Sequence, residues 1–115
     1  MKTISVPLRS EAMKRLDLDD SLLGDLEELQ LPEEQYAKLL QSGVLEKINS
    51  SLGKLIDEYE DESIQGNTDL TKSLDIFTSV YEHTKLEVLG KIISLNKLAL
   101  KSKTGLFFLF LSKIN

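Results

Sequence analysis

The chain has 115 residues, enough to bury one hydrophobic core, which predicts a single domain spanning residues 1–115. Hydrophobic residues make up 41% and charged residues 29%, a balance typical of folded proteins, so disorder is not expected. The absence of cysteine excludes disulfides, thiolate metal sites and a cysteine nucleophile. The net charge of −5 conceals an acidic block, because residues 17–82 hold seventeen acidic and four basic residues. Such a surface repels a phosphate backbone, so nucleic acid is not an expected partner.

Neither end of the chain predicts export or membrane insertion. The N-terminal segment MKTISVPLRSEAMKR has no apolar run of about 7–15 residues, so it is not a signal peptide. The longest apolar run, Leu106 to Leu111, is far shorter than the roughly 20 residues that a membrane helix needs. We therefore expect a cytoplasmic protein with no membrane partner.

The N-terminal segment predicts a short strand and a short helix. Ile4, Val6 and Leu8 alternate with Thr, Ser and Pro, the pattern of a half-buried strand that ends near its proline. Ser10 can cap a helix that runs to Leu16. The strand could pair with a partner protein or with the C-terminal strand of its own chain, and we favour the second.

Residues 17–34, DLDDSLLGDLEELQLPEE, contain eight carboxylates and no basic residue. Their leucines recur at about helical spacing and predict an acidic amphipathic segment, although Gly24 weakens a continuous helix. The spacing of Asp17, Asp19 and Glu28 is that of a calcium loop, but Leu22 stands where such a loop needs its turning glycine. A calcium site is therefore not expected.

Two further helices are expected after Leu31-Pro32, one over residues 33–42 and one over residues 44–59. The second ends in a dense group of carboxylates, which oppose the helix dipole at that end. These side chains are either presented to a partner or form a solvated helix end. Residues 63–67 form a predicted loop, and Thr68 can cap a following helix.

The C-terminal region should organise the fold. Residues 85–103 are apolar on most of the circumference of a helix, which predicts a central helix. Gly105 supplies a helix stop, and Leu106 to Leu111 reads as a strand buried on both faces. The predicted fold is mainly α, a bundle of about five helices with a minor two-stranded β element from the two ends of the chain. The expected core is Ile48, Leu52, Leu55, Leu74, Phe77, Val88, Leu89, Ile92, Ile93, Ala99 and Phe108.

The sequence offers little for catalysis. His83 is the only histidine, which excludes sites built on two histidines, and the six glycines are scattered singly rather than forming a phosphate-binding loop. A catalytic carboxylate must be desolvated in a pocket, whereas most carboxylates here lie in hydrophilic runs. We expect no enzyme, no metal and no cofactor.

The stretches DLDDSLLGDLEEL and DEYEDES give the chain the character of an acidic inhibitor. In size, acidity and lack of cysteine the protein resembles small bacterial immunity proteins that neutralise toxic nucleases, and antitoxin-like inhibitors more generally. The resemblance implies a protein-binding inhibitor with a basic protein partner, because a carboxylate surface mimics the phosphate that a nuclease grips. The alternative is a structural or regulatory helical module that self-associates, for example as a homodimer. The first predicted contact surface is Asp57, Glu58, Glu60, Asp61 and Glu62, and the second is Asp17, Asp19, Asp20, Asp25, Glu27 and Glu28.

Overall fold

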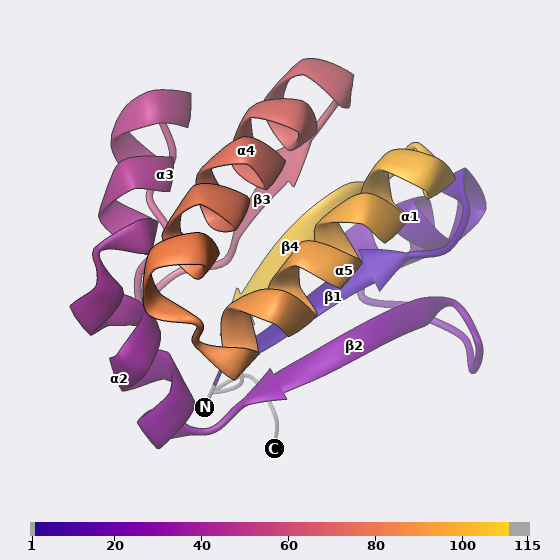
Figure 1. Ribbon diagram of the computed structural model, residues 1–115. Helices are drawn as coiled ribbons and strands as arrows, with labels where there is room; N and C mark the ends of the chain where they lie inside the picture. Colours follow the sequence, from indigo (N-terminus) through magenta and orange to yellow (C-terminus); the bar gives the residue numbers. More distant parts are fainter. Residues whose placement is uncertain (1, 111–115) are drawn as a thin grey trace.

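The computed structural model describes residues 2–110 and places a four-stranded antiparallel sheet at the centre of this part of the chain (Figure 1). The sheet order is β2-β1-β4-β3, so the two ends of the described chain form its inner strands. The elements in chain order are β1 (Lys2–Pro7), α1 (Ser10–Asp17), β2 (Leu26–Leu31), α2 (Glu33–Ser42), α3 (Val44–Leu52), β3 (Glu62–Gln65), α4 (Asn67–Thr84), α5 (Glu87–Ser102) and β4 (Gly105–Phe110).

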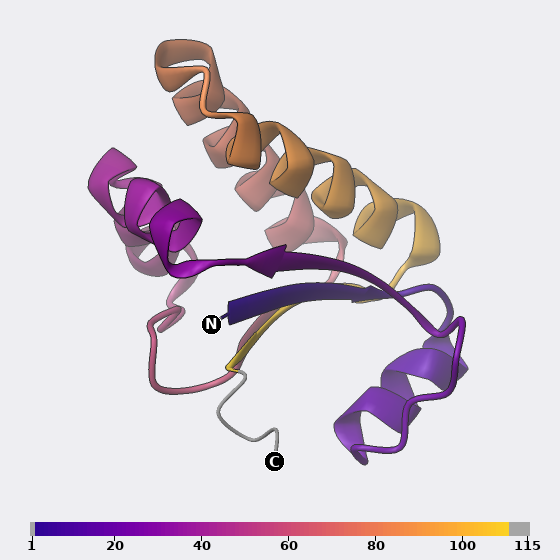
Figure 2. The same cartoon turned by 90° about the horizontal axis from the view of Figure 1, so that it is seen from below.

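The helices are distributed unequally over the two faces of the sheet. α4 and α5 pack against each other and cover one face, with α5 lying along β1 and β4 and α3 packed against α4. α1 lies on the opposite side of the sheet (Figure 2). None of the helices within residues 2–110 has the length and apolar character needed to cross a membrane.

Strand alternation sends one set of side chains into the helical layer. In β1 and β4 these are Ile4, Val6, Leu106 and Phe108, each at most 1% exposed, and Ile4 stands opposite Phe108 in the register. They pack against the apolar faces of the helices in one cluster. The helical contribution to this core includes Leu39, Val44, Ile48, Leu70, Phe77, Leu89, Ile92 and Ala99.

The prediction of a mainly α bundle with a two-stranded β element is wrong. The described residues form an α+β fold of five helices and a four-stranded antiparallel sheet. The pairing of the two chain ends is present, because β1 pairs with β4 over Lys2–Ser5. The missing strands are β2, which lies in the segment expected to be helical, and β3, which lies mostly in the expected 63–67 loop.

The predicted helix over residues 44–59 stops early. α3 ends at Leu52 because Gly53 adopts a left-handed conformation (φ 65°), which breaks the helix and which glycine accepts without strain. Leu55 and Tyr59 are 58% and 75% exposed, so Leu55 does not belong to the core. Three other expected core residues, Leu52, Leu74 and Ile93, are only half-buried.

A buried polar pair joins the two longest helices. The Ser73 hydroxyl on α4 donates to Asn96 Oδ1 on α5 over 2.7 Å, and Asn96 Nδ2 donates to the Leu70 carbonyl over 2.9 Å. Ser73 and Asn96 are both fully buried. Because a buried polar group that loses its hydrogen bond costs free energy, these bonds fix the position of α4 along α5.

Candidate functional site

The face of the sheet opposite α4 and α5 is the more open one. Alternation turns Phe107 and Leu109 of β4 toward this outer face, where both are half-buried. Ser5 of β1 lies opposite both Phe107 and Glu28, and its hydroxyl donates to Glu28 Oε2 over 3.0 Å. The outer face therefore presents apolar side chains beside polar and acidic ones.

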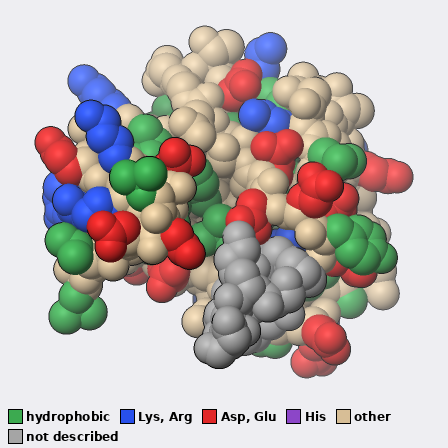
Figure 3. All heavy atoms as spheres, turned by 180° about the vertical axis from the view of Figure 1, so that it is seen from behind, with side chains coloured by type: hydrophobic (Ala, Val, Ile, Leu, Met, Phe, Trp, Pro, Cys, Tyr) green, Lys and Arg blue, Asp and Glu red, His purple; other side chains and the backbone are tan. Residues whose placement is uncertain are grey.

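A hollow of about 410 Å³, which we call the acidic hollow, opens on this outer face. Figure 3 shows acidic side chains on both sides of a recess with hydrophobic atoms at its floor. Four of the described lining residues are carboxylates and none is basic. The lining residues are Leu16, Asp17, Asp19, Asp61, Glu62, Ser63, Phe107 and Leu109.

One wall of the acidic hollow comes from the end of α1. Asp17 is the last residue of that helix, and Asp19 follows in a left-handed conformation (φ 58°) that aspartate tolerates better than most residues. The Asp19 backbone N–H donates to the Leu16 carbonyl over 3.0 Å, which fixes the turn. Asp17 and Asp19 are both exposed.

The other wall is the segment that leads into β3. Its carboxylates bind its own backbone: Glu62 Oε2 accepts the Leu55 N–H over 3.0 Å and Glu62 Oε1 accepts the Ser63 N–H over 2.9 Å. Asp57 Oδ1 accepts the N–H groups of Tyr59 and Glu60 over 2.8 and 3.1 Å, and these bonds lower the pKa of Asp57. The wall is therefore an ordered loop and strand rather than the predicted helix end.

A buried lysine lies beneath this second wall. The Lys2 ammonium donates to the Asp57 carbonyl and lies 5.9 Å from the centre of the Tyr36 ring. Burial lowers the pKa of Lys2, while the carboxylates of Asp57, Asp61 and Glu58 act in the opposite direction. This hydrogen bond thereby connects β1 to the loop between α3 and β3.

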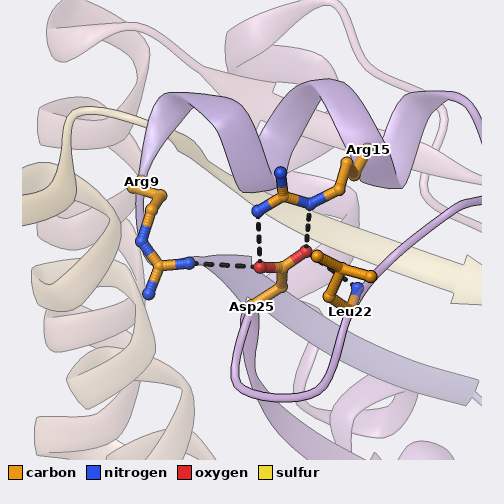
Figure 4. A network of polar contacts seen from close by, with 4 residues as sticks. All are labelled: Arg9, Arg15, Leu22 and Asp25. Carbon is orange, nitrogen blue, oxygen red and sulfur yellow. Dashed lines mark hydrogen bonds and ion pairs between the residues drawn. The ribbon is translucent and has the colours of Figure 1, made fainter.

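Asp25 is not available to a partner, although the sequence placed it in the second contact surface. It is 2% exposed and its carboxylate binds two arginines (Figure 4). Arg15 donates twice, over 2.7 and 2.8 Å, and Arg9 donates once over 3.1 Å. The Leu22 N–H donates to the same carboxylate over 2.9 Å. The Arg15 guanidinium, followed by the Leu22 N–H, holds the pKa of Asp25 well below its usual range.

The remaining predicted contact residues do not line the acidic hollow, and all of them are exposed except Asp57, which is half-buried. Glu58 and Glu60 lie in the loop before β3, and Asp20 lies just after α1. Glu27 and Glu28 lie on the edge strand β2, with Glu28 on the outer face. The structure thus brings Asp17 and Asp19 from one predicted surface together with Asp61 and Glu62 from the other.

Sequence reasoning missed the apolar part of this site. The sequence predicts Phe107 and Leu109 in a strand buried on both faces, and Leu16 at the end of a short helix. Leu111, the last residue of that predicted strand, lies outside the described residues. The outward direction of Phe107 and Leu109 could have been inferred from strand geometry. In a strand over residues 106–111, every second side chain must point away from a helical layer on the other face. Ser63 was placed in a loop and carries no signal of its own.

The acidic hollow can bind a cation through charge and an apolar or planar group through its floor. Within residues 2–110, no group of three or more His, Asp or Glu side chains is arranged to hold a metal ion. The lone histidine, His83, is exposed on α4 with Nδ1 2.9 Å from the Ser79 carbonyl. The arrangement suits recognition of a positively charged side chain.

The fold and the hollow together define an α+β domain with an acidic recess on the open face of its sheet. Comparison of the chain with protein-family models, with curated proteins and with solved structures found no match.

Proposed function

We propose that the protein is a non-enzymatic binding protein whose acidic hollow takes a basic segment of a protein partner. The observation that supports this most strongly is the meeting of two acidic segments, far apart in sequence, around an apolar floor. Carboxylates on both sides attract a cationic side chain, and the floor contacts its aliphatic or planar part.

The same features agree with an inhibitory role of the immunity or antitoxin kind. A protein that acts on nucleic acid is basic where it grips phosphate, and an acidic recess can cover such a region. Carboxylates also speed the encounter with a basic partner through long-range attraction. A phosphate-bearing ligand would be repelled by the same walls.

Arginine fits the acidic hollow better than lysine does. Its planar guanidinium can stack on the half-buried ring of Phe107 while pairing with carboxylates such as Asp17 and Asp61. A lysine ammonium offers the charge without the stacking plane. The proposal therefore includes a preference for arginine-bearing segments.

Titration of the ¹⁵N-labelled protein tests the proposal directly. A short oligoarginine peptide should shift the backbone amide resonances of residues 17–19 and 61–63, with weaker binding as salt is added. A matched oligolysine peptide should bind less tightly, and a matched oligoglutamate peptide should not bind.

Removing charge from the walls should weaken this binding. Replacing Asp17, Asp19 and Asp61 together by Asn keeps the left-handed turn and should raise the Kd for oligoarginine about tenfold, since each exposed pair contributes about 0.2–1 kcal/mol. The matched control neutralises three exposed carboxylates of the helical layer, Glu46→Gln, Asp75→Asn and Glu82→Gln. Equal loss in both variants would mean that net charge, rather than the hollow, determines binding.

The sheet order disfavours one form of the alternative, self-association through backbone pairing of the C-terminal strand. β4 pairs with β1 over Phe107–Phe110 and with β3 over Gly105–Phe108, so most of its backbone is already paired within the chain. Contact through the outer side chains Phe107 and Leu109 would occupy the acidic hollow itself. A dimer of that kind would dissociate when oligoarginine binds, which size measurements in the same titration would detect.

A further inference from the structure

Three leucines project into solvent from the connection between α1 and β2. Leu18 is 74% exposed, Leu22 is 59% exposed and Leu23 is completely exposed. The other large exposed apolar residues of the described chain are Leu40 on α2 and, in the connection between α3 and β3, Leu55 and Tyr59. Single exposed leucines are common on proteins, but several gathered in one short segment indicate an interaction surface.

The segment that carries them, residues 18–25, which we call the leucine loop, is tightly held. The buried Asp25 carboxylate binds Arg15, Arg9 and the Leu22 N–H, as Figure 4 shows. Three backbone bonds close its ends: Asp20 N–H to the Arg15 carbonyl, Asp25 N–H to the Leu22 carbonyl, and Leu8 N–H to the Asp25 carbonyl, at 2.7, 3.0 and 2.9 Å.

These hydrogen bonds hold the backbone of the leucine loop in a conformation that leaves the three leucines exposed. Two arginines and a buried carboxylate hold apolar side chains in water, an arrangement that adds nothing to the core. A binding surface gains from such order, because less conformational freedom is lost when a partner docks.

The leucine loop is continuous with the acidic hollow. Leu18 stands between Asp17 and Asp19, which both line that hollow, and the exposed Asp20 follows directly. A partner that reaches across both must offer apolar side chains next to basic ones. An anionic membrane surface is disfavoured by the same carboxylates.

We propose that the leucine loop is an anchor for a basic amphipathic segment of the partner, with the leucines contacting its apolar side chains while the carboxylates contact its lysines and arginines. This inference rests on the proposed function and specifies its partner. The hollow supplies charge recognition, and the leucine loop supplies the apolar area that charge contacts at a protein surface lack.

The test uses a synthetic peptide of about 14 residues, roughly four helical turns, with Leu and Lys at helical spacing. A peptide of the same length with every Leu replaced by Ser is the matched probe for charge alone. The Leu/Lys peptide should shift the amide resonances of residues 18–24 and bind at least about tenfold more tightly than the Ser/Lys peptide.

Matched variants separate the leucine loop from general apolar exposure. Leu18→Ser, Leu22→Ser and Leu23→Ser together should remove the advantage of the Leu/Lys peptide and leave Ser/Lys binding unchanged. The control, Leu40→Ser with Leu55→Ser, should bind both peptides as the wild type does. Circular dichroism should show each variant to be folded, since all five side chains are exposed.

Each contrary outcome points to a different failure. Equal affinity for the two peptides, with shifts at the hollow only, would overturn the leucine anchor while the proposed function stands. Absence of binding by every basic peptide would overturn both. Binding of the wild type to phosphatidylcholine vesicles, abolished by the triple leucine variant, would make the loop a lipid contact and overturn the inference.

Discussion

The conformation of the leucine loop depends on Asp25, and the ionisation of this residue should affect the free energy of unfolding. Because the Arg15 guanidinium lowers the pKa of Asp25 in the folded protein, folding favours the ionised form. The resulting stabilisation is complete above the ordinary aspartate pKa, near 4, and is lost as the pH falls below that value. The free energy of unfolding measured in urea should therefore decrease between neutral pH and about pH 3.

Comparison with Asp25→Asn isolates this residue from the other carboxylates. The variant should be less stable than the wild type at neutral pH, and its stability should fall less on acidification, because it has no carboxylate to protonate at this position. Asp75→Asn, an exposed carboxylate of α4, serves as the control. Parallel pH dependences for the wild type and Asp25→Asn would show that the network does not stabilise the ionised form.

The Ser73–Asn96 pair offers a second prediction at the scale of single residues. Ser73→Ala leaves Asn96 Oδ1 buried without its hydroxyl donor and should cost about 1–3 kcal/mol of unfolding free energy. Adding Asn96→Leu removes the orphaned acceptor, so the double variant should lose less than the sum of the two single losses. Chemical denaturation of all four proteins measures the coupling, and strict additivity would contradict it.

Adjacent residues of β4 should differ in how strongly the same substitution destabilises the protein. Phe108 is 1% exposed in the core, so Phe108→Lys places a charge among apolar side chains and should abolish folding. Phe107 is half-buried on the outer face, so Phe107→Lys should give a folded protein of reduced stability. Circular dichroism and amide spectra distinguish the two, and collapse of both would mean that the outer face is as closed as the inner one.

Two glycines form another matched pair, one in a helix and one in a strand. A Cβ at Gly105 would lie 3.0 Å from the Ile64 carbonyl of the paired strand, so Gly105→Ala should destabilise by about 1–3 kcal/mol. A Cβ at Gly90 in α5 would meet only the Tyr81 ring at 3.6 Å. Gly90→Ala should therefore stabilise by about 0.5–1 kcal/mol, as helix propensity predicts. Thermal unfolding of both variants checks the opposite signs.

The elements that sequence reasoning predicted were those whose own pattern is strong. The helix after Pro32, the apolar α5 and the two terminal strands all show clear periodicity or caps. β2 was missed because Leu26 and Leu29 of LEELQL are three apart, a spacing that suits a helix as well as a strand. Pairing with β1 makes this segment a strand, and a local sequence pattern does not reveal such long-range pairing.

Local sequence patterns also predict only part of the candidate site. Both acidic segments were recognised from charge alone, but their meeting around one recess requires the sheet order, which local patterns do not contain. The sequence predicts Asp25 as a surface group because it belongs to residues 17–34, which contain eight carboxylates and no basic residue. Its burial follows from Arg9 and Arg15, which no sequence spacing linked to it.

At the scale of the whole molecule, the edges of the sheet determine how it meets other copies. β2 forms one edge and carries the exposed Glu27 and Glu28, whose like charges oppose edge-to-edge pairing, while β3 at the other edge has only four residues. We expect a monomer at neutral pH. Replacing Glu27 and Glu28 by Thr should produce concentration-dependent association in sedimentation experiments, and a wild-type dimer would contradict the prediction.

The neighbouring positions of β1 and β4 have a consequence for the protein during its synthesis. Thr104 donates its hydroxyl to the carbonyl of Pro7, 97 residues earlier in the chain. A ribosome therefore releases β1 and its neighbour β2 long before β4, the strand that must lie on the other side of β1. Until β4 emerges, the inner edge of β1 is open and the apolar face of α5 has no complete sheet to cover. We therefore expect the nascent chain, rather than the finished protein, to be the form most prone to aggregation and most dependent on chaperones.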